Sequence, residues 1–525
     1  MKYFFKKGLF LLPALMLLLT ACEEDLDVVN PNEPTLDVLD TEDGIKRAML
    51  GMYNTFDGGF VWVVNAHHEC MGDALYIPWG NFSWRWANQP TSITLDDGTV
   101  VTPPQGGTQA QELVLRNDRA QGDNNAFIWE WAYMYRLNNI SNLLISKLDE
   151  GTIELSGDAA TKEATVRAFA HFWKGFTYSR IGSMYSAGII TDVFGETNPN
   201  FVTRQALIDE ANNQLDLAID QLGRVGDEAV YAEFLSAGIP DFMRPDGVPT
   251  TDEFVRNINT LKARNILVNT KVADMTDQQW AQIESLASNG LQQGDNYLQF
   301  RTADENSNFR TGFNPYRVLI GWHFPSERLI QDFKDGDERF ARNFALLATP
   351  QVNRAGRGIQ YGTRYGFATI DEGGDYATLT SGLAVLDVAG SWEEASLMEA
   401  EALINQGSVE DGLALIDAVR TAQNSGLPAV TGTGLDQATA IDELYLERRI
   451  GLFLRGLPFY DARRFGVIDP ISEGGGREGA VVLDANGVLN TNATFDYNYL
   501  NYWGVPDDEL DFNLPAMGSA SVEPE

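Results

Sequence analysis

The segment SWEEASLMEAEALINQ (391–406), followed after Gly407 by SVEDGLALIDAVRTAQ (408–423), has the pattern that decides the fold class. Apolar side chains recur along one face of each stretch every three or four residues, as in amphipathic helices. They are Trp392, Ala395, Met398 and Ala402 in the first stretch and Val409, Leu413 and Ile416 in the second. Gly407 suits a helix C-terminus, and Ser408 with Asp411 forms a capping box for the next helix. The sequence therefore predicts a helix hairpin.

Helical periodicity extends over seven further segments, roughly 42–56, 124–148, 160–182, 203–222, 254–271, 277–289 and 436–455. Paired helices of this size resemble tetratricopeptide repeats, whose unit is about 34 residues, although the repeat consensus is absent. Between the helices lie long stretches rich in Gly, Asn, Thr and aromatic residues, at about 57–123, 290–390 and 456–525. Because long loops in compact proteins are usually functional, we expect ligand binding in these regions.

The N-terminus MKYFFKKGLFLLPALMLLLTAC (1–22) is built like a secretory leader. Three lysines precede an eleven-residue apolar run at 9–19, which is too short to span a membrane because a spanning helix needs about 20 residues. Leu-Thr-Ala-Cys at 19–22 resembles the lipobox of bacterial lipoproteins, so we predict a signal peptide over 1–21 and lipidation of Cys22. The alternative is a secreted soluble protein with a chance cysteine. The acidic run at 23–25 resembles a tag for export to the cell surface.

Composition narrows the function classes. The chain has 38 Lys and Arg against 74 Asp and Glu, a net charge of −36, and the acidic residues are spread along its whole length. Phosphate binding needs clustered cations, so nucleic acid is not expected as a partner. With Cys22 lipidated, Cys70 is the one remaining cysteine and no intramolecular disulfide can form. No Pro-, Ser- or Gly-rich linker divides residues 22–525, and no cofactor motif is evident.

Seven blocks stand out along the chain: DLDVVNPNEPT (25–35), MGDAL (71–75), WEWAYMYRLNNISNLLISKL (129–148), VRAFAHFWKGFTYSRIGSMY (166–185), SLMEAEALINQG (396–407), ELYLERRIGLFLRGLPFYDARRFG (443–466) and VPDDELDFN (505–513). Taken in order, they resemble the SusD/RagB family of Bacteroidetes outer-membrane nutrient-binding lipoproteins. The segment 443–466 is the most specific. It departs from the family pattern at Gly451 and Arg455, where glutamates are usual, and at Pro458, where arginine is common.

The resemblance implies a mainly α fold, with about four tetratricopeptide-like helix pairs as a scaffold and long loop-rich insertions that bind ligand. It implies one domain over 22–525 and no catalysis. It also implies a partner, a SusC-like TonB-dependent barrel in the outer membrane, to which the lipid-anchored protein delivers oligosaccharide or, in some members, peptide. The expected location is therefore the outer membrane, at the cell surface.

The stretch YIPWGNFSWRW (76–86) is the main candidate ligand site. Phe82, Trp84 and Trp86 recur every second residue, so an extended backbone would place them on one side. Sugars present C–H patches that stack on aromatic rings, while nearby amides and guanidinium groups bind their hydroxyls. The candidate residues are Trp79, Asn81, Trp84, Arg85 and Trp86, with Asn88 nearby, and Tyr316 and Trp322 in the second stretch FNPYRVLIGWHF (313–324). The alternative is that these rings anchor a long loop to the body.

Two other clusters have metal-ligand residue types. His67-His68-Glu69-Cys70 has no matching distant pair and does not predict zinc. The segment DFKDGDE (332–338) could hold calcium but lacks EF-hand spacing, so an exposed acidic turn is favoured. In 443–466 we expect Leu444, Tyr445 and Leu452 to face a core, Gly456 and Pro458 to end the helix, and Asp461 to pair with Arg463 and Arg464.

Three function classes follow. The first is a surface protein that binds nutrient glycans for a transporter. The second is a lipid-anchored glycoside hydrolase, which needs two carboxylates across a cleft, and a chain with 74 acidic residues does not single out such a pair. The third is a helical-repeat scaffold for other proteins. The identity of the ligand cannot be inferred from these patterns.

Overall fold

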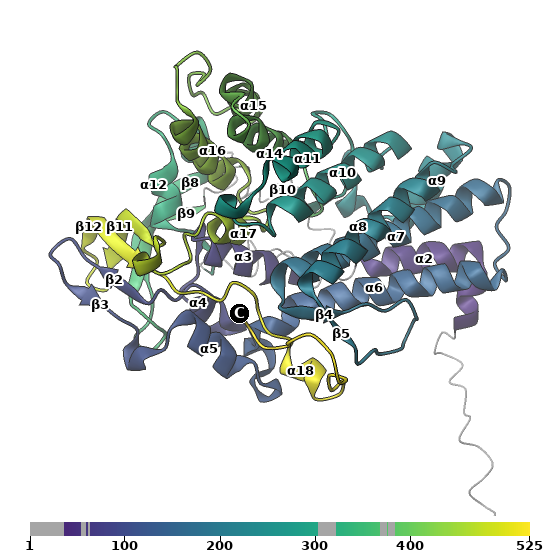
Figure 1. Ribbon diagram of the computed structural model, residues 1–525, viewed down its shortest axis with the longest axis horizontal. Coiled ribbons are helices and arrows are strands. Elements are labelled where there is room, and N and C mark those ends of the chain that lie inside the picture. Colours follow the sequence, from purple (N-terminus) through teal and green to yellow (C-terminus); the bar gives the residue numbers. More distant parts are fainter. Residues whose placement is uncertain (1–35, 54–58, 61–62, 303–321, 368–374, 376–383) are drawn as a thin grey trace, which may run out of the picture.

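A computed structural model describes residues 36–525 except 54–58, 61–62, 303–321, 368–374 and 376–383 (Figure 1). The longer helices are α2 (Glu42–Met52), α6 (Ala126–Glu150), α7 (Ala159–Met184), α8 (Arg204–Leu222), α9 (Glu228–Gly238), α10 (Thr251–Leu267), α11 (Asp277–Ser288), α14 (Trp392–Asn405), α15 (Val409–Ala422) and α16 (Gln437–Gly451). The shorter helices are α3 (Asn65–Met71), α4 (Trp84–Ala87), α5 (Gln109–Arg116), α12 (Glu327–Asp332), α13 (Glu338–Asn343), α17 (Pro458–Arg464) and α18 (Asp507–Leu510). Within the described ranges, no helix is both long enough and apolar enough to cross a membrane.

Consecutive helices pack against each other as hairpins: α6 with α7, α7 with α8, α10 with α11, and α14 with α15 (Figure 1). The predicted hairpin is α14–α15, and its apolar faces are buried as expected, with Met398, Ala402 and Leu413 fully inaccessible. The mainly helical prediction is therefore confirmed.

The turn of this hairpin differs in one detail from the prediction. Gly407 has φ 91°, and the backbone N–H groups of Gly407 and Ser408 donate to the carbonyls of Ile404 and Leu403, which together form a Schellman motif. The predicted capping box is wrong, because the side chain of Ser408 makes no cap hydrogen bond to the helix that follows.

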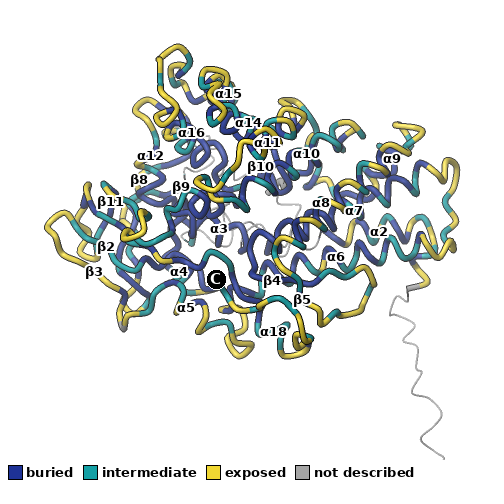
Figure 2. The backbone as a smooth tube through the Cα atoms, in the orientation of Figure 1, coloured by how far each residue is buried: buried dark blue, intermediate teal, exposed yellow. Residues whose placement is uncertain are grey.

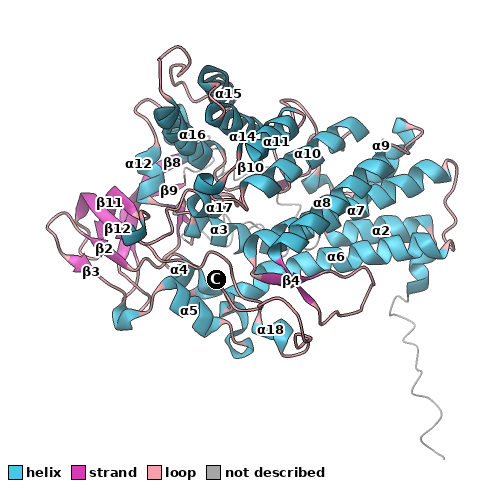
Figure 3. Ribbon diagram, viewed as in Figure 1, coloured by secondary structure: helices cyan, strands magenta, loops and turns pink. Residues whose placement is uncertain are grey.

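The predicted loop regions contribute most of the β-structure. A six-stranded antiparallel sheet has the order β3-β2-β12-β11-β9-β8. Its strands are β2 (Ser92–Thr94), β3 (Val100–Val101), β8 (Phe344–Val352), β9 (Tyr361–Phe367), β11 (Arg477–Asp484) and β12 (Leu489–Asp496). Two strands come from each of the regions 57–123, 290–390 and 456–525, so three segments distant in sequence form one sheet beside the helices (Figure 3).

Three two-stranded pairs complete the strands: β1 (Leu75–Tyr76) with β7 (Phe324–Pro325), β4 (Ala187–Ile189) with β5 (Phe201–Thr203), and β6 (Gln299–Thr302) with β10 (Ala384–Asp387). Most of the buried apolar side chains form one continuous cluster that runs from Ile45 to Val505 and includes helices and sheet alike. The buried interior appears in Figure 2 as a dark centre surrounded by exposed turns. A smaller cluster around Trp280, Ile283 and Met398 joins α10, α11 and α14.

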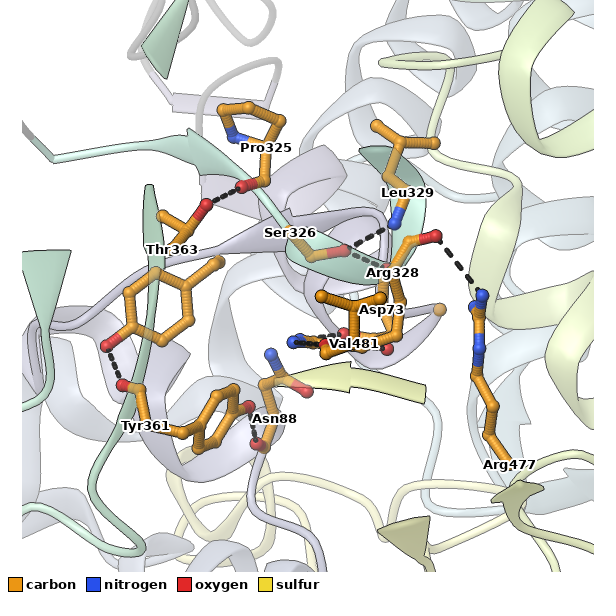
Figure 4. Close-up of polar contacts among 12 residues, drawn as sticks. Asp73, Asn88, Pro325, Ser326, Arg328, Leu329, Tyr361, Thr363, Arg477 and Val481 are labelled. Atoms are coloured by element: carbon orange, nitrogen blue, oxygen red, sulfur yellow. Dashed lines mark hydrogen bonds and ion pairs between the residues drawn. The ribbon is translucent and has the colours of Figure 1, made fainter. Parts of the chain in front are cut away.

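A buried ion pair between Arg328 of α12 and Asp73, just after α3, lies where helices and sheet meet (Figure 4). Arg328 donates from Nε and Nη2 to the two carboxylate oxygens of Asp73, at 2.8 and 2.7 Å. Ser326 donates through its hydroxyl to the backbone carbonyl of Asp73 at 2.6 Å. Arg449 of α16 donates to the carbonyls of Gly72 and Asp73, at 2.6 and 3.1 Å. The turn after α3 is therefore held from two other helices.

The segment 443–466 has the packing role expected from sequence, since Leu444 and Leu452 are buried and Tyr445 is half-buried. Asp461 does bind Arg464, at 2.8 Å, and also Arg448, at 2.9 Å. The predicted pair between Asp461 and Arg463 is wrong. Arg463 instead donates to the backbone carbonyls of Ser183, Val268 and Asn501, which include the ends of two helices.

We expect Asp73→Asn to destabilise the protein by about 3 to 5 kcal/mol, because it leaves the buried guanidinium of Arg328 without a counter-charge. Asparagine preserves the shape of the side chain and tolerates the left-handed backbone at this position, where φ is 53°. Denaturant unfolding would measure the change. The matched control is Asp43→Asn, which breaks an exposed pair with Arg47 and should cost less than about 1 kcal/mol. Equal effects of the two substitutions would contradict the prediction.

Candidate ligand-binding site

The two candidate stretches of the sequence lie together. Strand β1, which begins the first stretch, pairs with β7 at the end of the second, with Leu75 opposite Pro325 and Tyr76 opposite Phe324. Trp322 consequently lies beside the loop that follows β1, and its ring centroid is 6.2 Å from that of Trp84. Phe82 and Trp129, at the start of α6, extend the group, with their centroids 5.1 Å apart. Trp79 stands three residues before Phe82 in the same loop. We refer to the half-buried side chains Phe82, Trp129 and Trp322, together with Trp79 of this loop, as the aromatic face.

The loop that builds this face has an unusual backbone. Phe82 and Ser83 have φ values of 55° and 57°, in the left-handed region that side chains other than glycine rarely adopt. Buried His67 is within hydrogen-bonding distance of the Phe82 carbonyl, with its Nε2 at 2.6 Å, and the Ser83 hydroxyl donates to the carbonyl of Asn124. Burial lowers the pKa of His67 to about 4, so the ring is neutral at pH 7 and donates from a protonated Nε2. These contacts hold Phe82 in place.

The predicted extended backbone is therefore wrong, because residues 81–83 form a 3₁₀ turn and 84–87 a helix. Trp84 is fully buried, with its ring centroid 4.8 Å from His323 and its Nε1 donating to the carbonyl of Val63 at 3.3 Å. Arg85 is also fully buried and donates to the carbonyls of Asn88 and Ile359. The structure corrects both expectations: neither side chain presents a surface to a ligand, and both anchor the loop.

The other predicted residues differ in position. In the short helix α4, Trp86 is rotated about 200° from Trp84 and lies against α5, where the guanidinium of Arg116 is 4.3 Å from its ring centroid. Trp86 is thus separate from the aromatic face. Trp79 is half-buried, and the neighbouring Asn81 is exposed. Tyr316 lies outside the described residues.

Sequence reasoning missed Trp129. It is followed one helical turn later by Tyr133, and the two ring centroids are 6.0 Å apart. Trp129 donates from Nε1 to the carbonyl of Asp123 at 3.1 Å, which fixes the ring at the edge of the face. The i, i+4 aromatic spacing in WEWAYMY was the available signal, since such side chains lie on one side of a helix.

In the described part of the chain, no group of three or more His, Cys, Asp or Glu side chains is placed so that it could hold a metal ion. The His68 ring lies 2.9 Å from Glu130, and both are buried with Arg180.

In the acidic segment 332–338 the expectation of an exposed turn is wrong for two residues. Asp332 and Asp337 are buried and paired with arginines, whereas Asp335 is exposed.

A pocket of about 520 Å³ lies between α13, α15 and α16. Charged side chains line it, but Arg339, Arg342 and Arg455 each bind a carboxylate. The arginines that line this pocket are therefore already paired with carboxylates of described residues. The aromatic face is consequently the stronger candidate.

Neither protein-family models nor curated proteins match this chain. Solved structures do. A SusD-like carbohydrate binding protein from Bacteroides vulgatus covers 92% of this chain and 98% of its own, at a TM-score of 0.54 and 14% identity. Surface glycan-binding protein A from Bacteroides thetaiotaomicron covers 90% and 97%, at a TM-score of 0.54 and 13% identity.

The fold is SusD-like. A SusD superfamily protein from B. vulgatus agrees, with a TM-score of 0.54, 14% identity, and coverage of 90% of this chain and 97% of its own. At sequence identities this low, the similarity shows the fold alone. They confirm the fold expected from the sequence motifs, and they leave the function to be argued from the site.

We expect Trp84→Ala to destabilise the protein by about 3 to 5 kcal/mol, because it removes a fully buried ring and leaves a cavity between the loop and Trp322. Denaturant unfolding would measure the loss. Trp79→Ala is the matched control, since the same atoms are removed from a half-buried position. A loss for Trp84→Ala no greater than that for Trp79→Ala would show that Trp84 is not an anchor.

Proposed function

We propose that this SusD-like protein binds glycans, without catalysis, at the aromatic face. The observation that carries the proposal is that three segments bring half-buried Phe82, Trp129 and Trp322 together around Trp84, while the loop that holds Phe82 also carries half-buried Trp79 and exposed Asn81. Aromatic rings offer flat apolar area to sugar C–H groups, and the amide can bind hydroxyls. Two solved structures of the same fold are named carbohydrate-binding and glycan-binding proteins, which supports this ligand class.

We further propose that the protein is anchored in the outer membrane through lipid on Cys22, faces the cell exterior, and delivers its ligand to a SusC-like TonB-dependent barrel. The lipobox-like sequence at 19–22 supports the anchor. The motifs shared with the SusD/RagB family support the partner. The same scaffold binding a peptide or another nutrient is the alternative ligand, and a surface-anchored glycoside hydrolase is the alternative activity.

The binding proposal predicts that the mature chain, residues 22–525, retains one or more polysaccharides in affinity electrophoresis and releases no products from them. Trp79→Ala should weaken binding about tenfold, because a stacked ring contributes on the order of 1 kcal/mol beyond its buried area. Trp86→Ala is the control, since Trp86 lies under Arg116 against α5 and should bind like the parent.

The other outcomes would indicate a different function or a different site. Released products would indicate the hydrolase, and absence of binding to every polysaccharide would favour a peptide ligand or a scaffold role. Loss of binding in Trp86→Ala but not in Trp79→Ala would place the site against α5 instead.

The anchor proposal predicts that Cys22→Ala moves the protein from the membrane fraction to a soluble or mislocalised form, because the thiol that accepts the lipid is gone. Membrane fractionation and labelling with a fatty acid would measure this. Cys70→Ala is the control, since Cys70 is buried in the core and cannot be lipidated in the folded chain. Unchanged fractionation and labelling of Cys22→Ala would refute the anchor.

A further inference from the structure

Most arginine side chains in the described part of this acidic chain are paired with a carboxylate. Examples on the surface are Arg256 with Asp295 at 2.7 Å and Arg364 with Glu327 at 2.9 Å. Among the exposed or half-buried arginines of the described ranges, four have no carboxylate oxygen of a described residue within 4.0 Å. They are Arg136, Arg224, Arg354 and Arg357. In a chain with 74 acidic residues, the lack of a carboxylate partner at these four arginines needs an explanation.

Two of these four lie at Trp79. The guanidinium carbon of Arg354 is 4.8 Å from the centroid of the Trp79 ring. Arg357 lies beside the next residue, since a Cβ built on Gly80 would be 3.5 Å from its Nη1. Both arginines belong to the turn between β8 and β9, which Asn353 holds by donating from its backbone to the carbonyl of Tyr361 at 3.1 Å. Their place beside the aromatic face is therefore fixed by the sheet.

The guanidinium of Arg357 is also incompletely bonded. Its Nη1 is shielded from solvent and has no hydrogen-bond acceptor among the described atoms. A shielded donor without an acceptor is unfavourable, so the half-buried side chain of Arg357 gains a hydrogen bond if it turns toward an incoming acceptor. The guanidinium of Arg354 lies over the Trp79 ring, and such a contact uses the face of the guanidinium group and leaves its N–H groups able to donate at its edge. Two cations therefore lie beside half-buried Trp79 and Gly80.

We propose that the glycan bound at the aromatic face is anionic, and that Arg354 and Arg357 bind its carboxylate or sulfate group while a sugar ring packs on Trp79. This inference rests on the proposed function. Guanidinium groups bind both kinds of oxyanion through paired hydrogen bonds. The net charge of −36 repels an acidic polymer from most of the surface, so the two arginines also determine where such a ligand approaches.

The test titrates the mature chain by calorimetry with three oligosaccharide sets of matched length: neutral, uronic-acid-containing, and sulfated. We expect at least one acidic set to bind about tenfold or more tightly than the neutral set, with an affinity that falls as salt is added. Arg354→Gln and Arg357→Gln should each weaken acidic binding roughly tenfold and leave neutral binding unchanged. Arg224→Gln is the matched control, because it changes the net charge equally at the exposed end of α8.

The acidic sets distinguish the source of the oxyanion, and preference for either one supports the inference. Neutral oligosaccharides bound as tightly as acidic ones, without salt dependence, would overturn it while the glycan-binding proposal stands. An equal loss of neutral and acidic binding in Arg354→Gln would also overturn it, since Arg354 would then only support the Trp79 ring. Binding to none of the three sets would overturn the glycan-binding proposal itself. Arg354 is exposed, so its variants test the inference even if Arg357→Gln fails to fold.

Discussion

Paired charges inside the protein dictate how its helices and sheet meet, and the pair between Arg328 and Asp73 is central to them. A guanidinium removed from water needs acceptors for its N–H groups, and a carboxylate in good geometry also compensates its charge, so each such pair fixes the relative position of the two elements that provide it. Arg328 joins α12 to the turn after α3, Arg449 joins α16 to Asp332 of α12, and Arg464 joins α17 to Glu401 of α14. If one of these elements shifted alone, a buried charge would lose its partner. Paired charges therefore add to apolar packing in holding the junction together.

The candidate site inherits that rigidity. Asp73 stands two residues before β1, and the loop of the aromatic face leaves β1 directly, so the base of the loop cannot move away from α12. Pairing of β1 with β7 then brings Trp322 to the same place, while the sheet supplies Arg354 and Arg357 on the turn between β8 and β9. Rings from loops, a helix and a strand end are consequently presented on a fixed support. Because this surface is already ordered, it loses little conformational entropy when a ligand binds. A few strong contacts are then enough for binding.

The helices were predictable because their apolar periodicity is local and their lengths are ample, as in α6, α7 and α14. The sheet was not, since its strands are short, lie between Gly- and Asn-rich turns, and pair with partners from distant regions. At the candidate site, the sequence indicated a loop that the structure places beside Trp322 and Trp129, but it did not separate buried Trp84 from half-buried Trp79. In the sequence, Trp84 and Trp79 cannot be told apart. The left-handed backbone at Phe82 and Ser83 turns Trp84 inward and leaves Trp79 half-buried, and neither Phe nor Ser indicates such a backbone. The unpaired state of Arg354 and Arg357 is likewise a property of the three-dimensional arrangement.

Strand β12 separates β2 from β11 in the sheet, and its residue Thr494 pairs with Thr94. The strand that joins the two halves of the sheet therefore lies far along the chain from β2. Helical hairpins such as α6–α7 rely on near neighbours and can form early in folding, whereas β2 keeps an unpaired edge until the distant segment β12 reaches it. A chain cut short before residue 489 would keep most of its helices yet hold two separated half-sheets with open edges, which favour aggregation.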